Sequence, residues 1–217
     1  MRQRILLLCG ILAPLVYVAT VVLGGLITPG YSHKSQAVSE LIQSGAQNKF
    51  LLDPLFALYN LLTAAFGVGL FMAVRARPST EGRVIGSVGA LALVVEAVVG
   101  LVTIFFPQDP RGAVPTLTGS THIVLASLSS LATIATILLM GLWLRRISQV
   151  RRYSMYSFIS VVIILISGGL AAWGIASDNP FGGIFERITI GAFLQWMFVM
   201  GLKLYSSTEE ALALRSG

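Results

Sequence analysis

The residues best suited to chemistry are two histidines and several carboxylates, which lie in or beside the connections between long apolar stretches. Histidine nitrogens and carboxylate oxygens bind zinc and transfer protons, and arginine binds anionic groups. Both histidines are predicted to lie on one side of the molecule, so we expect these residues to converge on one site. The candidates are His33, Ser39, Glu40, Asp109, His122, Glu186 and Arg187.

One chemistry available to this set is metal-dependent hydrolysis. His33 and His122, with a carboxylate from Asp109 or Glu186, would hold a zinc ion and leave one coordination position open for water. Glu40 or Glu186 would then serve as the general base. The chain contains no HExxH or comparable motif, so this interpretation depends on residue types alone.

Two alternatives use the same residues differently. A serine–histidine arrangement would combine Ser35 or Ser39 with His122 and Asp109, although no nucleophile elbow supports it. Recognition without chemistry would have His122 and Arg187 bind an anionic lipid headgroup while carboxylates orient them. We favour recognition over hydrolysis. A structural network that only fastens the loops is the remaining interpretation.

The elements that must position these residues are membrane-spanning helices. The chain of 217 residues is 55% hydrophobic and 11% charged, and its mean hydropathy is +0.83. Charged residues make up about a quarter of soluble domains. These values exclude a soluble globular domain, a disordered chain and a coiled coil. Cys9 is the single cysteine, so no internal disulfide can form.

Six stretches are long enough to cross a bilayer, which takes about 20 apolar residues. We expect an all-α fold in which one transmembrane domain, residues 1–217, forms a six-helix bundle. The predicted spans are roughly 5–28, 51–74, 83–106, 119–144, 153–176 and 184–205.

The net charge of +6 comes from basic residues near the helix ends and not from a surface patch, so we expect no nucleic-acid partner. Six spans put both termini on one side. Four of the 15 basic residues lie on the opposite side: Lys34, Lys49, Arg111 and Arg187. The other eleven are Arg2, Arg4, Arg75, Arg77, Arg83, Arg145, Arg146, Arg151, Arg152, Lys203 and Arg215. The positive-inside rule therefore predicts cytoplasmic termini.

Glu96 is a carboxyl group inside the third stretch. It lies about ten residues from one end of the stretch, which at 1.5 Å per residue is roughly 15 Å deep and near the bilayer midplane. Because a lone carboxylate is costly there, we expect Glu96 to be protonated, hydrogen-bonded or facing water. If the third and fourth stretches pack as a hairpin, Ser129 or Thr133 would donate the hydrogen bond. A structural hydrogen bond is the favoured interpretation, and a proton site in a small transporter is the alternative.

Four short segments are distributed over most of the chain: GYSHKSQAVSEL at 30–41, FPQD at 106–109, GSTH at 119–122 and ERI at 186–188. Together they resemble the domain-of-unknown-function 998 family of prokaryotic membrane proteins. The resemblance implies a six-span integral membrane protein with outward-facing polar motifs, and it implies no particular activity.

These observations lead us to expect a multi-pass protein of the cell membrane whose extracytoplasmic polar site recognises a lipid headgroup. Membrane lipids are the expected partners, and a homodimer stays open. The alternatives are a metal-dependent hydrolase acting on a lipid, with zinc as its cofactor, and a small transporter that uses Glu96. Whether the protein is an enzyme is left open.

Overall fold

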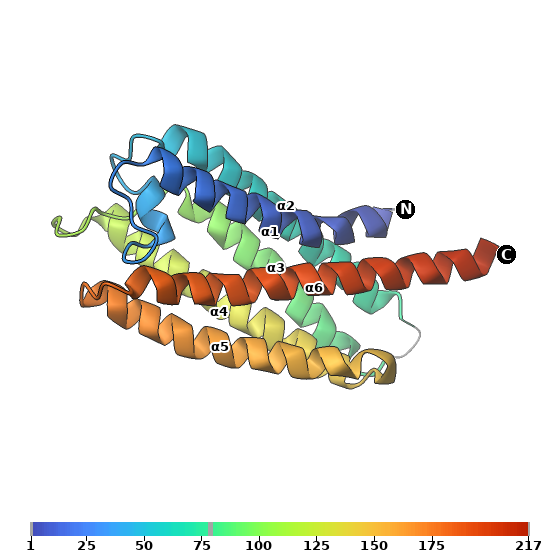
Figure 1. Ribbon diagram of the computed structural model, residues 1–217. Helices are drawn as coiled ribbons and strands as arrows, with labels where there is room; N and C mark the ends of the chain where they lie inside the picture. The colour runs from blue at the N-terminus through green and yellow to red at the C-terminus, as the bar shows by residue number, and fades with distance from the viewer. Residues whose placement is uncertain (1, 78–79, 217) are drawn as a thin grey trace.

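Each predicted stretch forms one α-helix in the computed structural model, which describes residues 2–77 and 80–216 (Figure 1). Within these residues all regular elements are helical, so the all-α expectation is confirmed. Two short 3₁₀ helices, η1 (Val38–Ile42) and η2 (Ser148–Val150), lie in connections. The α-helices are α1 (Arg2–Ile27), α2 (Lys49–Arg75), α3 (Arg83–Thr103), α4 (Leu117–Arg145), α5 (Arg151–Ala176) and α6 (Gly182–Ser216).

All six helices are long and apolar enough to cross a membrane, α6 over its segment Gly182–Ser206. The chain is therefore an integral membrane protein. Three boundaries differ from the prediction by three residues or more: α1 begins at Arg2 instead of near 5, α3 ends at Thr103 instead of near 106, and α6 continues to Ser216 instead of ending near 205. Phe106 precedes a proline, and the residue before a proline disfavours the α-helical conformation. The Phe106 backbone N–H donates to the Thr103 carbonyl, three residues earlier, as in a 3₁₀ turn, so the α-helix has already ended.

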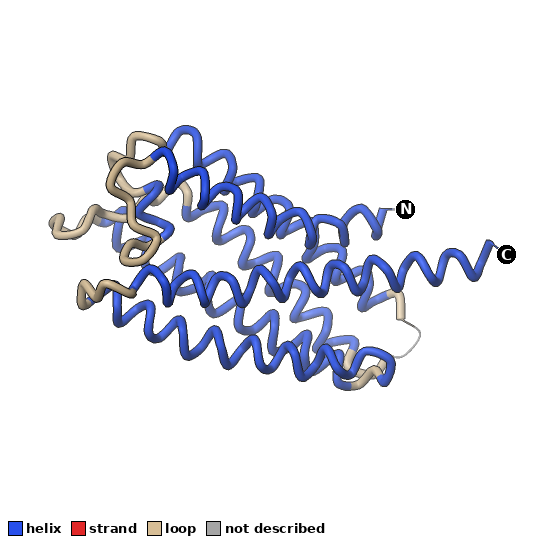
Figure 2. Tube along the Cα trace, viewed as in Figure 1, coloured by secondary structure: helices blue, strands red, loops and turns tan. Residues whose placement is uncertain are grey.

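The helices form a closed ring in chain order. Each packs against its neighbour in sequence, and α6 packs against α1. Because the ring alternates in direction, both termini lie at one end, which we call the terminal end (Figures 1 and 2). The other end carries the connections 28–48, 104–116 and 177–181, and we call it the loop end. Arg215 lies beyond the residues whose side chains the structure describes.

Small residues allow the helices to approach closely near the terminal end. A Cβ on Gly86 would lie 2.8 Å from the Trp143 ring, and one on Gly67 would lie 2.8 Å from the Val94 side chain. Gly82 starts α3 with a positive φ of 68°, a conformation that favours glycine. These glycines therefore serve helix packing and the turn before α3.

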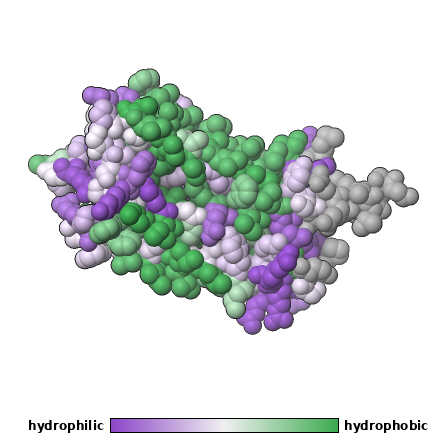
Figure 3. Space-filling model, in the orientation of Figure 1, coloured by the Kyte–Doolittle hydropathy of each residue, from purple (hydrophilic) through white to green (hydrophobic). Residues whose placement is uncertain are grey.

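The outer surface of the bundle is apolar over its middle. Figure 3 shows hydrophobic side chains across the centre of one face and hydrophilic side chains concentrated toward both ends. Ile123 and Leu131 of α4 are 66% and 64% exposed. Such a belt matches the hydrocarbon layer of a bilayer.

Candidate functional site

The first connection, residues 28–48, folds over the loop end of the bundle, and we call it the lid. Its helix η1 carries Val38 and Leu41, which are 5% and 0% exposed. Both pack in one apolar cluster with Val21 of α1 and with Leu52 and Phe56 of α2. The lid is therefore inserted into the bundle and does not lie flat on its surface.

Glu40 and Arg111 form the central ion pair of the loop end. Glu40 is buried, accepts a 2.7 Å hydrogen bond from the Ala37 backbone N–H, and pairs with Arg111 Nη2 at 2.9 Å. Arg111 also donates to the Ser35 carbonyl at 2.8 Å and to Asp178 at 3.1 Å. Its hydrogen bond to Glu40 raises the pKa of Arg111. One arginine thus joins all three connections.

Arg187 holds the lid to α6. Its Nη1 donates to the carbonyls of Gln36 at 2.8 Å and Gly183 at 2.9 Å. Its Nη2 donates to the Tyr31 hydroxyl and to His33 Nδ1, the latter at 3.2 Å. Burial raises the pKa of Tyr31 to about 12, and partial burial together with the Arg187 charge lowers the pKa of His33. The two terminal nitrogens of the guanidinium are therefore occupied by groups of the lid and α6.

Glu186 and Ser39 make two further attachments of the lid. Glu186 Oε2 accepts a 2.8 Å hydrogen bond from the Val38 backbone N–H and lies 3.8 Å from Arg187 Nη1. Ser39 Oγ donates to Gln108 Oε1 in the second connection at 2.6 Å. Together with Arg111 and Arg187, these contacts attach the lid to α6 and to the neighbouring loop.

Asp109 and His122 do not pair with each other in the hydrogen bonds of the structure. Asp109 accepts two 2.8 Å hydrogen bonds from the Thr116 backbone and hydroxyl, which lower the pKa of Asp109. This close approach to α4 requires Gly119, where a Cβ would collide with the Asp109 carboxylate. His122 Nδ1 lies 2.8 Å from the Phe106 carbonyl. Because a carbonyl only accepts, Nδ1 donates, and Nε2 of a neutral ring remains an acceptor.

Several candidates for the two hydrolytic arrangements make other contacts in the part of the chain that the structure describes. No three His, Cys, Asp or Glu side chains there lie close enough together to hold a metal ion. The hydroxyl of Ser39 is bonded to Gln108, and His122 is bonded to Phe106. The contacts of the loop residues favour the interpretation in which this polar network fastens the loops.

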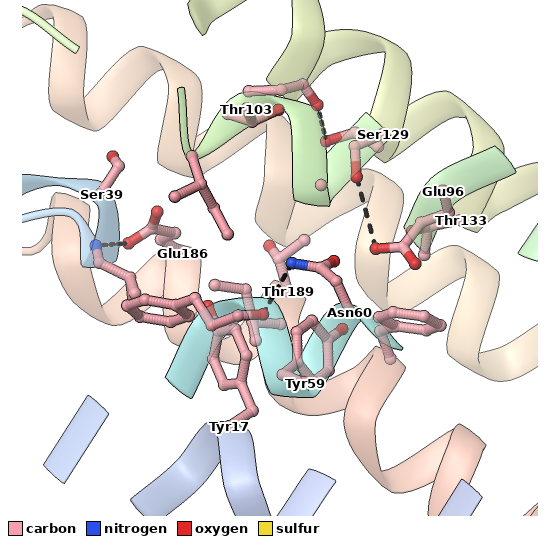
Figure 4. Close-up of a pocket in the computed structure, with 18 of the residues that line it drawn as sticks. Tyr17, Ser39, Tyr59, Asn60, Glu96, Thr103, Ser129, Thr133, Glu186 and Thr189 are labelled. Atoms are coloured by element: carbon pink, nitrogen blue, oxygen red, sulfur yellow. Dashed lines mark hydrogen bonds between the residues drawn. The ribbon is translucent and has the colours of Figure 1, made fainter. Parts of the chain in front are cut away.

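A cavity of about 280 Å³ lies beneath the lid and is lined by all six helices (Figure 4). Val38, Ser39 and Ile42 of the lid contribute to its lining. Its polar groups come from several helices and include candidates from both the loop and the membrane interior. The candidates that line it are Ser39, Glu96, His122, Ser129, Thr133 and Glu186, whereas His33, Glu40, Asp109 and Arg187 are not among its lining residues.

Glu96 lies on one side of this cavity and Glu186 on the other, with tyrosines between them (Figure 4). Glu96 Oε1 accepts the expected hydrogen bond from Ser129 Oγ, at 3.4 Å. Glu96 is only 5% exposed, and its Oε2 is buried without a hydrogen-bond partner among the described residues. An unsatisfied buried carboxyl oxygen costs free energy unless a donor reaches it.

The polar lining of the cavity is rich in acceptors. Asn60 Nδ2 donates to the Phe56 carbonyl at 2.9 Å, which leaves its Oδ1 as an acceptor beside Gly100. Glu96 Oε2 and His122 Nε2 add to these acceptors. Among the described residues that line the cavity there is no lysine or arginine. These groups can accept hydrogen bonds, and the hydroxyls of the lining residues Tyr17 and Tyr59 can donate them.

The α4 side of the cavity borders the surface of the bundle. Ser130 and Ala126 of α4 line the cavity and are also exposed on the bundle surface. Ser130 lies on the same face of α4 as Gly141, about three turns away. Gly141 is packed against Phe158 of α5, with only 3.0 Å between its ideal Cβ and the ring. The α5-facing stripe of α4 is thus covered by Phe158 near the terminal end and carries the exposed residues Ser130 and Ala126 toward the loop end.

Toward the terminal end the cavity is closed by apolar packing. Phe66, Leu70, Leu93, Ile137 and Met140 are all 0% exposed and belong to one hydrophobic cluster. Leu93 lies one helical turn from Glu96 toward the terminal end. In this conformation Glu96 therefore faces the cavity on one side and a dry core on the other.

Comparison with family models matches residues 11–203, which is most of the chain, to the family described as "Protein of unknown function (DUF998)". The chain belongs to the DUF998 family. The resemblance expected from the sequence segments is thereby confirmed. Comparison of this chain with the curated proteins and with the solved structures found no match.

Two parts of this DUF998 protein's loop end and cavity were not singled out from the sequence. Arg111 counted only as a charge in a connection, since no local pattern links it to Glu40, 71 residues earlier. Asn60 and the tyrosines at 17 and 59 lie in apolar stretches. An amide such as Asn60 within a predicted span is unusual, and this signal could have identified it.

Proposed function

We propose that this DUF998 protein binds the polar end of a membrane amphiphile, such as a lipid, in the cavity beneath its lid. The observation that carries the proposal is a cavity near the loop end that contains several polar groups and is lined by Ser130 and Ala126, two residues exposed on the bundle surface. We propose that the cavity opens sideways at these two residues. A volume of about 280 Å³ suits a headgroup and is too small for a whole lipid, because pockets for drug-sized ligands hold about 300–1,000 Å³.

We propose two roles for the predicted site residues. His122, Glu186 and Ser39, with Glu96, Ser129 and Thr133, line the cavity and would contact the headgroup. His33, Glu40, Asp109 and Arg187 would hold the lid and loops that cover it. This division replaces the expected grip of His122 and Arg187 on an anionic headgroup, since the terminal nitrogens of Arg187 donate to lid and α6 groups.

We further propose that the loop end faces away from the cytoplasm and that the protein resides in the cell membrane. This is supported by the basic residues, which gather at the terminal end and in its short connections. A headgroup in the cavity would then belong to the outer leaflet of that membrane.

The test is mass spectrometry of lipids retained by the purified protein. Ser130→Trp fills the lateral opening, and Leu128→Trp adds the same side chain about 200° around the helix, where Leu128 is already 46% exposed. We expect the wild type and Leu128→Trp to retain a stoichiometric amphiphile and Ser130→Trp to lose it. Equal retention by both variants, or no retained amphiphile in the wild type, would contradict the proposal.

A further inference from the structure

The lining of the cavity has a charge pattern that selects among headgroups. Two carboxyl side chains, Glu96 and Glu186, lie at its two sides, and no lysine or arginine is present among its described lining residues. An anionic phosphate or sulfate group beside Glu96 would meet a carboxyl group with no lysine or arginine among the lining residues to offset it, whereas Glu186 has Arg187 Nη1 3.8 Å away. The electrostatics therefore disfavour an anionic headgroup in the cavity.

Glu96 is the feature that specifies a ligand with its own donor. The side chain is 95% removed from solvent, since its exposed fraction is 5%. Ser129 satisfies Oε1, whereas Oε2 is buried without a partner among the described residues. A cationic N–H group placed in the cavity would supply both the hydrogen bond and the opposite charge.

Aromatic rings line the cavity between the two carboxyl groups. Tyr17 packs edge-on against Phe56 and Tyr59, with ring centroids 5.6 Å and 4.8 Å apart. All three rings line the cavity, and Figure 4 shows the two tyrosines between Glu186 and Glu96. The negative faces of aromatic rings attract ammonium groups. The rings thus add a second, independent attraction for a cation.

We propose that the cavity is selective for an amphiphile with an ammonium headgroup, with Glu96 as its charge partner. This inference rests on the proposed function, because the ligand enters the same cavity through the same opening. The ammonium group donates to Glu96 Oε2, the tyrosine rings flank it, and its alkyl chain leaves between α4 and α5 toward the hydrocarbon layer.

The test compares three probes of equal chain length: octylammonium, 1-octanol and octyl sulfate. Each is titrated calorimetrically into the protein in phosphatidylcholine nanodiscs, and the signal from empty nanodiscs is subtracted. We expect octylammonium to bind at least about tenfold more tightly than octanol, with octyl sulfate the weakest. Glu96→Gln keeps an acceptor for Ser129, and we expect it to remove the preference for octylammonium over octanol. Glu81→Gln, on an exposed acid at the terminal end, should change neither.

The outcomes separate the two proposals. Equal binding of octylammonium and octanol to the wild type overturns ammonium selectivity but leaves amphiphile binding standing. Binding of octyl sulfate more tightly than octylammonium has the same two consequences. Binding of none of the probes overturns both. If Glu96→Gln does not fold, the order of the three probes on the wild type still decides the inference. A Glu96→Gln variant that folds and keeps the full preference also overturns it.

Discussion

Replacing Arg111 with methionine should loosen the lid more than any other part of the molecule. The change removes the charged partner of Glu40 and leaves that carboxylate in place. Glu40 would keep its hydrogen bonds from the Ala37 backbone and from Gln36. Contacts from Arg111 to Ser35 and Asp178 would also be lost.

The expected cost follows from the exposure of the two side chains. Removing one partner of a fully buried ion pair costs about 3–5 kcal/mol, whereas an exposed pair contributes about 0.2–1 kcal/mol. The Glu40 side chain is 3% exposed and that of Arg111 is 34% exposed. We therefore expect about 2 kcal/mol of lost lid stability. Since about 1.4 kcal/mol is a factor of ten, lid opening should become about thirtyfold more frequent.

Hydrogen exchange detected by mass spectrometry measures this opening directly. We expect amides of the lid that are protected in the wild type to exchange about thirtyfold faster in Arg111→Met, while α2 and α3 amides in the buried core keep their rates. Arg151→Met, an exposed arginine at the start of α5, is the matched control and should leave the lid unchanged. Unchanged lid exchange in Arg111→Met, or an equal increase throughout the bundle, would refute the reasoning.

Two further predictions concern the contact between the second connection and α4. Gly119→Ala puts a methyl group against the Asp109 carboxylate and should lower the melting temperature by several degrees. At Gly169 a Cβ meets nothing within 4 Å, so Gly169→Ala should leave the melting temperature unchanged or slightly higher. Equal shifts for the two variants would argue against the close approach of Asp109 to Gly119. The pKa of Asp109 is lowered, so the folded state favours its ionised form, and this stabilisation is present at neutral pH and is lost as pH falls below about 4. As the pH is lowered from 6 to 3, the melting temperature should therefore fall more steeply for the wild type than for Asp109→Asn. The same pH dependence in both proteins would contradict the role of this carboxylate.

The sequence by itself determined the helices and the depth of the intramembrane polar groups. Six apolar stretches can only be helices in lipid, because every backbone group must be satisfied within its own segment. Short connections make neighbouring helices antiparallel, so Glu96 and Ser129 reach the same depth, and their hydrogen bond was predictable from counting residues. The family resemblance came from four short segments, two in connections and two near the starts of α4 and α6, and was equally visible without a structure.

Only the tertiary structure decided what the loop residues do. Glu40, His33 and Arg187 are predicted binding groups, and the structure adds that Arg187 donates to backbone carbonyls of the lid and α6. Loop side chains follow no helical period, so sequence spacing does not limit which of many polar partners each will meet. The cavity has the same origin, because it is formed where six helices fail to fill the space between them. Its acceptors come from residues as far apart as Asn60 and Glu186, and only packing brings them to one place.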